Sequence, residues 1–153
     1  MMLMFKLVVG NVSQQQTQAS NDGQVSTSPN NDHSVFKTIT TQAELEILLN
    51  EAKAQEKLVM VDLYADWCIE CKIMANTLFA DGQVKEELAK IESIKLDITE
   101  FNDFHKSYLE EKGVFGPPAL LFYGLDGNII QDAQVLGEIS KEDFLNHLQQ
   151  FDY

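Results

Sequence analysis

The sequence predicts an α/β domain with a mixed central β-sheet and helices on both of its faces. Runs of apolar, strand-forming residues alternate with segments whose apolar residues recur at helical spacing. A turn signal at Leu125–Asn128 joins two late strands into a hairpin, which adds an antiparallel pair to the sheet. The length of 153 residues suits one such domain plus a tail.

The tail is expected at residues 1–33 and the domain at residues 34–153. Met1–Val9 is apolar but too short to span a bilayer, so we interpret it as the end of a membrane helix of a longer parent or as a cloning remnant. From Asn11 to His33 the chain is rich in Gln, Ser, Asn and Thr, which predicts a flexible linker.

The elements of the domain are predicted from local patterns. Thr41–Glu44 is a capping box that opens a helix, and Gly113 suits a helix end. Leu58–Ala65 is almost continuously apolar, which indicates a strand buried on both faces. The predicted order is strand Val35–Ile39, a helix after Thr41, strand Leu58–Ala65, helix Cys68–Phe79, helix Asp81–Lys90, strand Ser93–Ile98, helix Phe101–Lys112, strand Ala119–Tyr123, strand Gln134–Glu138 and a helix after Ser140.

The charge is strongly acidic. The formal net charge is −13, and all eleven basic residues are lysines. Such a surface repels phosphate backbones and anionic lipids, so we expect no nucleic-acid partner and no electrostatic docking to membranes. A well-solvated surface explains the acidity without any partner, and we expect the isolated domain to be a monomer.

The two cysteines, Cys68 and Cys71, stand three positions apart. A disulfide scaffold would need more cysteines, and a structural zinc site would need further ligands at metal spacing. The histidines His33, His105 and His147 are scattered and supply no such pair. Three interpretations of the pair remain: redox chemistry, two structural cysteines, or half of a metal site.

The local context favours redox chemistry. The motif Trp67-Cys-Ile-Glu-Cys71 follows a buried strand and opens a helix. The free N–H groups and the dipole at a helix N-terminus favour negative charge, so Cys68 should ionise readily and act as the nucleophile. Cys71 lies one turn further in. We expect it to be better shielded and to resolve the mixed disulfide.

These motifs resemble the thioredoxin superfamily, and within it the C-terminal periplasmic domains of the DsbD family. The resemblance implies a thioredoxin fold. It extends from about Val35 to Phe151 and is carried by Val59–Lys72 (VMVDLYADWCIECK), Phe79–Val84, Gly116–Pro118 and Gly137. By this resemblance Cys68 attacks, Cys71 resolves, and Pro118 is a cis-proline beside the disulfide. Pro117, and Ala119 where threonine is common, depart from the pattern.

Asp62 lies in the middle of an apolar strand, where a carboxylate is costly to bury unless it is used or paired. An alternative is that it faces solvent at a strand edge. The resemblance implies that this acid moves protons at Cys71 and that Lys95 lies beside it.

Three further positions are ambiguous. The second acid of the DsbD family is missing, because Ala75 occupies its place. Glu70 between the cysteines substitutes for it in one interpretation and simply faces solvent in the other. Trp67 serves either packing or partner contact.

The resemblance implies a protein-disulfide reductase in the periplasmic domain of an inner-membrane protein. Electrons would pass from a membrane-embedded cysteine pair of the parent protein, through Cys68 and Cys71, to periplasmic thiol/disulfide domains. We expect no bound cofactor and no metal beyond this redox-active pair. A protein-disulfide oxidase or isomerase, or a metal-binding module, are the alternatives.

Overall fold

A five-stranded mixed sheet forms the centre of residues 34–153, the part of the chain that this computed structural model describes. The strands are β1 (Lys37–Ile39), β2 (Val59–Tyr64), β3 (Glu92–Asp97), β4 (Ala119–Tyr123) and β5 (Val135–Leu136), in the order β1-β3-β2-β4-β5. Strands β1, β3 and β2 are parallel, whereas β4 runs antiparallel to β2 and β5 antiparallel to β4. The mixed sheet predicted from the sequence is confirmed.

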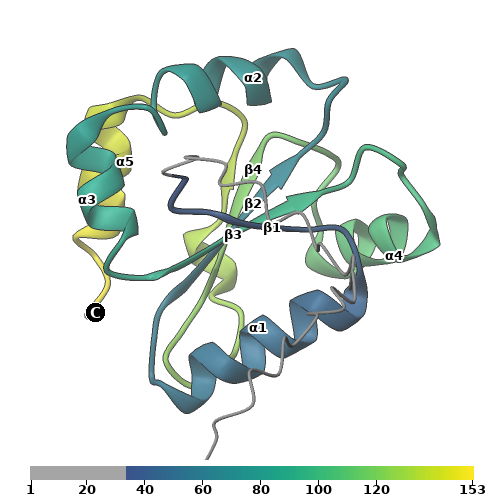
Figure 1. Cartoon of the computed structure of the whole chain (residues 1–153), viewed down its shortest axis with the longest axis horizontal. Coiled ribbons are helices and arrows are strands. Elements are labelled where there is room, and N and C mark those ends of the chain that lie inside the picture. The colour runs from purple at the N-terminus through teal and green to yellow at the C-terminus, as the bar shows by residue number, and fades with distance from the viewer. Residues whose placement is uncertain (1–33) are drawn as a thin grey trace, which may run out of the picture. The chain divides into compact units, whose positions relative to one another are not determined.

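Helices cover both faces of the sheet, as predicted. Figure 1 shows α1 and α4 on one side and α2, α3 and α5 on the other. The helices are α1 (Gln42–Ala54), α2 (Ile69–Asn76), α3 (Gly82–Leu88), α4 (Asp103–Lys112) and α5 (Lys141–Leu148). Within residues 34–153, no helix has the length and apolar character that a membrane crossing requires.

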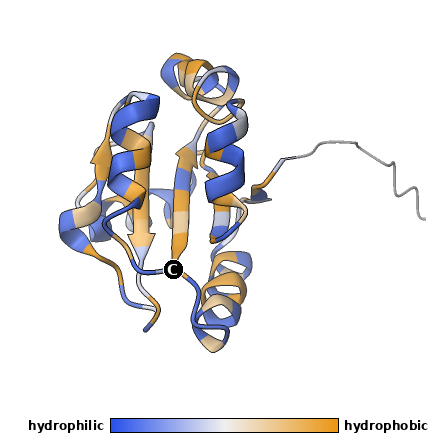
Figure 2. Cartoon of the chain, turned by 90° about the vertical axis from the view of Figure 1, so that its left-hand side faces the viewer, coloured by the Kyte–Doolittle hydropathy of each residue, from blue (hydrophilic) through white to orange (hydrophobic). Residues whose placement is uncertain are grey.

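The two faces of the sheet build two separate cores. Alternate residues of a strand point to opposite faces, so Val61 packs with α1 and α4 while Met60 packs with α2, α3 and α5. In Figure 2 the strands are coloured as hydrophobic over most of their length, whereas each helix carries both hydrophilic and hydrophobic residues. Strand β2 is therefore enclosed on both faces, as its apolar run predicted.

The helix ends follow the sequence signals. Thr41 and Glu44 form the capping box reciprocally. Asn102 caps α4, and Gly113 ends that helix in the left-handed region with a φ of 69°. Asp81 and Ser140 cap α3 and α5.

Several predicted boundaries are wrong. Strand β5 is restricted to Val135–Leu136 instead of Gln134–Glu138, because Gln131–Ala133 forms an unpredicted 3₁₀ turn just before it. Helix α4 starts at Asp103, since Phe101 has a positive φ of 47° that a helix does not tolerate. The expected linker and apolar lead-in, residues 1–33, lie outside the described residues.

We expect Phe144→Ala to lower the free energy of unfolding by about 3–5 kcal/mol, because this fully buried ring of α5 would leave a cavity. Phe115→Ala is the matched control, since its ring is entirely exposed, and should change stability by less than about 0.5 kcal/mol. Urea unfolding measures both. Similar losses for the two variants would contradict the assignment of the core.

Candidate functional site

Cys68 and Cys71 form a disulfide at the N-terminus of α2, directly after β2 and a short loop. Their Cα atoms are 5.3 Å apart. Cys68 is the N-cap residue of the helix, and its Sγ accepts a hydrogen bond from the Cys71 backbone N–H at 3.1 Å. After reduction, a thiolate at Cys68 would face the unpaired N–H groups and the positive end of the helix dipole. The geometry thus favours ionisation of Cys68.

The predicted difference in shielding between the two cysteines is wrong for this oxidised form. Cys68 and Cys71 are each 4% exposed. Both belong to the core cluster on the α1 and α4 side of the sheet, so the loop before α2 is folded against the core along with the helix. The Cys71 Sγ lies 3.8 Å from the Leu63 carbonyl oxygen. Position at the helix cap, and not exposure, distinguishes the two sulfurs.

The loop before the disulfide is anchored by the loop after β3. The Thr99 carbonyl oxygen accepts a hydrogen bond from the Trp67 indole N–H at 3.1 Å, and the Thr99 hydroxyl accepts one from the Asp66 backbone N–H at 2.9 Å. The Trp67 ring meets the Phe101 ring edge to face, with centroids 6.3 Å apart. Trp67 nevertheless remains 55% exposed, so both packing and partner contact are open to it.

Pro118 lies at the same end of the sheet as the disulfide, because Ala119 of β4 pairs with Leu63 near the end of β2. The Pro117–Pro118 peptide bond is cis, as the resemblance implies. The Pro118 carbonyl oxygen accepts a hydrogen bond from the Gly137 N–H at 3.0 Å. A cavity of about 350 Å³ adjoins this loop and is lined by Val114, Phe115, Gly116, Pro117, Pro118, Leu136 and Gly137.

Asp62 is 4% exposed, so the alternative that it faces solvent is wrong. Its position in β2 alternates with that of Val61, which places it on the sheet face that α2, α3 and α5 cover. Burial raises the pKa of Asp62 to about 7, and the positive charge of Lys95 opposes this rise in part. A carboxyl group with such a pKa can take up and release protons near neutral pH.

Lys95 and Glu70 have different environments. Lys95 pairs with Asp62 in the register of β3 and β2, which agrees with the lysine that the resemblance places beside the acid. Glu70 lies in the first turn of α2 and is exposed, which agrees with the solvent-facing interpretation.

Sequence reasoning missed Thr99, Phe101 and Phe115. Thr99 contacts Asp66 and Trp67 across more than thirty residues of chain, and no local pattern signals such a contact. Phe115 could have been found, because the neighbouring Gly116 and Pro117 signal a tight loop, and such loops lie at the surface.

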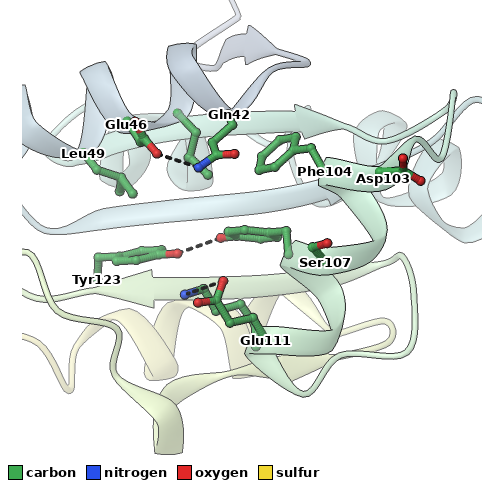
Figure 3. A pocket seen from close by; sticks show the side chains of 11 residues that line it. Gln42, Glu46, Leu49, Asp103, Phe104, Ser107, Glu111 and Tyr123 are labelled. Atoms are coloured by element: carbon green, nitrogen blue, oxygen red, sulfur yellow. Dashed lines mark hydrogen bonds and ion pairs between the residues drawn. The ribbon is translucent and has the colours of Figure 1, made fainter.

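A second cavity, of about 500 Å³, lies between α1 and α4, on the face of the sheet opposite to the one that carries Asp62 (Figure 3). At its floor the hydroxyl groups of Tyr108 and Tyr123 are hydrogen-bonded at 2.7 Å. None of the predicted site residues lines it. No group of three or more potential metal ligands occurs in the part of the chain that the structure describes.

The raised pKa of Asp62 predicts an unusual pH dependence of stability. The folded state holds this proton up to a pH of about 7, whereas the unfolded state loses it near 3.8, so the stability that it contributes is lost as pH rises between these values. Asp62→Asn removes this loss. We expect the variant to gain stability over the wild type by on the order of 1 kcal/mol per pH unit across this range.

Urea unfolding of the two oxidised proteins at pH 4, 5.5 and 7.5 measures the difference. A gap that stays constant with pH would contradict the raised pKa, because all other titrating groups are common to both proteins.

Comparison with known proteins agrees with this geometry. A family profile described as a thioredoxin-like domain matches residues 45–152. The thiol:disulfide interchange proteins DsbD of Pseudomonas fluorescens and Yersinia enterocolitica are 38% and 39% identical over 77% and 76% of the chain. The chain spans about a fifth of the length of these relatives, 20% in each case.

Solved structures agree as well. The oxidised DsbD C-terminal domain of Neisseria meningitidis superimposes with a TM-score of 0.67 at 28% identity, covering 74% of this chain and 98% of that one. A thioredoxin from Thermus thermophilus shares the fold, with a TM-score of 0.62 at 19% identity over 76% of this chain and 86% of its own. The chain therefore belongs to the thioredoxin-like family and resembles the C-terminal domains of DsbD proteins.

Proposed function

We propose that this domain is a thiol–disulfide oxidoreductase that works as a protein-disulfide reductase. The proposal rests on the Cys68–Cys71 disulfide at the N-terminus of α2, which lies at the same end of the sheet as the cis-Pro118 loop. A disulfide so placed can open and close without moving the fold, since both cysteines lie within one helical turn.

The reaction begins with the reduced pair. The Cys68 thiolate attacks one sulfur of a partner disulfide, and the other partner sulfur leaves as a thiolate. Cys71 then loses its proton and attacks the Cys68 sulfur, which releases the second partner sulfur and closes the Cys68–Cys71 bond. Two electrons pass to the partner, whose two sulfurs end as thiols after taking up two protons.

Asp62 is assigned to the proton of Cys71. The face of β2 that carries Asp62 is the face that α2 covers, and its pKa of about 7 suits proton exchange near neutral pH. Pro118 is assigned to the partner backbone, which its loop can meet in extended form. Trp67 has a supporting role as contact surface, Lys95 as a neighbour of the acid, and Glu70 as a weaker electrostatic influence.

The surface around the site suits a protein partner. Exposed apolar side chains come from the loop before α2 and from α2 itself, from the loop after β3 and from the two segments that line the Pro118 cavity: Trp67, Ile69, Ile73, Phe101, Phe115 and Leu136. Trp67 contacts Phe101, Phe101 and Phe115 line one cavity, and Phe115 and Leu136 line the Pro118 cavity. Exposed apolar residues grouped in this way mark interaction surfaces. Such a surface favours a folded or extended polypeptide over a small soluble thiol.

The names of the relatives support a place in an electron relay. We infer that a membrane-embedded cysteine pair of a longer parent reduces Cys68–Cys71, and that periplasmic thiol/disulfide domains are reduced in turn. In this proposal the domain lies in the periplasm, attached to an inner-membrane protein, and needs no cofactor other than its own disulfide.

A reductant differs from an oxidase or isomerase in reduction potential. We expect the Cys68–Cys71 couple to equilibrate with glutathione buffers as a reducing pair, below about −200 mV, a range that oxidases such as DsbA exceed. Quantifying oxidised and reduced protein across a redox buffer series measures it. A potential near −120 mV would overturn the direction proposed here. Elemental analysis of the reduced protein tests the metal-binding alternative.

We expect Cys71→Ser to trap a mixed disulfide with an oxidised partner, because Cys68 can attack but nothing resolves the bond. Incubation with a peptide that carries one internal disulfide should yield a covalent adduct that dithiothreitol cleaves, visible by mass spectrometry. Cys68→Ser is the matched control and should yield none. An adduct with Cys68→Ser alone would reverse the assignment of nucleophile and resolving residue.

We expect Asp62→Asn to slow the resolving step near neutral pH, because Cys71 loses its proposed proton acceptor. Stopped-flow exchange with the same peptide across pH separates attack by Cys68 from resolution by Cys71. Attack should be unchanged or slightly faster, since a negative charge that opposes thiolates is gone. An unchanged resolving rate at pH 7 would remove Asp62 from the mechanism.

A further inference from the structure

Lys95 and Asp62 are neighbours that do not form an ion pair. They face each other in the register of β3 and β2, on strands whose backbones are separated by about 4.8 Å in any sheet. A lysine side chain is long enough to close that distance. Yet the ion pairs within residues 34–153 involve other residues, namely Lys37–Glu92, Lys90–Glu87, Lys112–Glu111 and Lys141–Asp81.

The Lys95 ammonium group lies on two aromatic rings instead. Its Nζ is 5.4 Å from the centroid of the Phe36 ring and 4.9 Å from that of the Tyr64 ring. Both distances fall within the range in which the negative face of a ring attracts a cation. Lys95 is half-buried, so water screens this attraction less than it would at an open surface.

Each ring is itself held in place. The Phe36 ring meets the Phe79 ring edge to face at 5.0 Å, and Phe79 belongs to the core under α2, α3 and α5. The Tyr64 hydroxyl donates a hydrogen bond to Asp66 at 2.9 Å, in the loop that leads to the disulfide. The two rings therefore form an anchored pair, which we call the Lys95 clamp.

We propose that Phe36 and Tyr64 are positioning residues whose clamp holds the Lys95 ammonium away from the Asp62 carboxylate and so keeps Asp62 available as a proton carrier. The use of that proton rests on the proposed function, whereas the clamp itself rests on the contacts above. A lysine in direct contact would hold the carboxylate in its charged form. An acid so paired would bind a proton too weakly to serve Cys71.

The other elements around Asp62 bring neutral groups to it, so Lys95 is the charge that matters for its protonation. Strand β4 brings Leu120 opposite Asp62, and α2 brings Met74 to the same face of the sheet. Tyr64, two residues along β2, is a neutral phenol whose pKa is raised by burial and by its bond to Asp66. Lys95 is the charged group that acts on the pKa of Asp62 in this structure.

The test is the pKa of Asp62 itself, read from the side-chain carboxyl ¹³C shift by NMR titration of the oxidised chain. Phe36→Leu removes one ring face and frees the ammonium to approach the carboxylate. We expect the pKa of Asp62 to fall by about 0.5, the equivalent of one cation–π contact. Phe36→Tyr keeps a ring in place and should restore the wild-type value.

A second pair of variants separates two effects of Phe36, namely holding Lys95 in position and keeping water away from Asp62. The separation is needed because a smaller residue at this position also admits water. Lys95→Met should raise the pKa of Asp62, because the charge that lowers it is gone, and adding Phe36→Leu should then have no further effect. A fall of equal size with and without Lys95 would overturn the clamp, and so would an unchanged pKa in Phe36→Leu alone. Phe104→Leu, a partly buried ring on the opposite face, controls for loss of packing.

The pH profile of the resolving step adds a functional readout. If the proposed function holds, Phe36→Leu should move the lower limb of this profile by the same amount as the NMR titration. The NMR result needs no partner and no turnover. Failure of the reductase activity therefore leaves the clamp intact, and failure of the clamp leaves the reductase activity intact.

Discussion

Burial of a carboxyl group at the centre of the sheet is the constraint around which this domain is arranged. Asp62 occupies the middle strand, with β3 and β4 on either side and helices above and below. Replacing it with an apolar residue would remove a desolvation penalty, so its presence has to be explained by something other than stability. A group whose charge is suppressed by burial responds strongly to any nearby charge. The position of Lys95 therefore matters more than it would at a surface.

The disulfide and the acid place opposite electrostatic demands on one small region. The start of α2 favours a thiolate at Cys68, whereas an ionised Asp62 would oppose a second negative charge close by. A pKa of about 7 reconciles them in the proposed mechanism, because both forms of the acid are populated near neutral pH. The neutral form places no negative charge beside the Cys68 thiolate, and the ionised form can accept the proton that Cys71 loses. The order of events follows from which group is charged at each stage.

Local patterns predicted most of the fold, because caps, strand runs and turns are decided by residues close in sequence. Thr41 and Gly113 act within one turn of their own helices, and both were predicted correctly. The length of β5 was predicted wrongly, because a 3₁₀ turn just before it shortens the paired segment, and this turn has no apolar pattern of its own. The equal burial of Cys68 was missed for a similar reason. It reflects packing against residues distant in the sequence.

The candidate site also has a part that local patterns predicted and a part that they did not. The residue pattern predicted a nucleophile at Cys68 and a buried acid at Asp62, because both are unusual residues in readable local contexts. The side chains that position them, Thr99 beside the active-site loop and Phe36 over Lys95, are ordinary residues whose contacts cross the sheet. Sequence reasoning about one chain finds the reacting groups before it finds their supports.

The surface around the disulfide includes exposed apolar side chains such as Trp67 and Ile69, while the chain as a whole is strongly acidic. In the proposed exchange, a large apolar interface would hold a partner after the reaction and slow its release. Here the mixed disulfide itself supplies the bond during exchange, so the non-covalent contact needs only to align two sulfurs and then to release them. The acidity repels acidic proteins and speeds encounter with partners whose disulfides lie in basic surroundings. Alignment by exposed aromatic side chains such as Phe115, with charge selecting the encounter, suits the proposed exchange, in which the domain dissociates after every turnover.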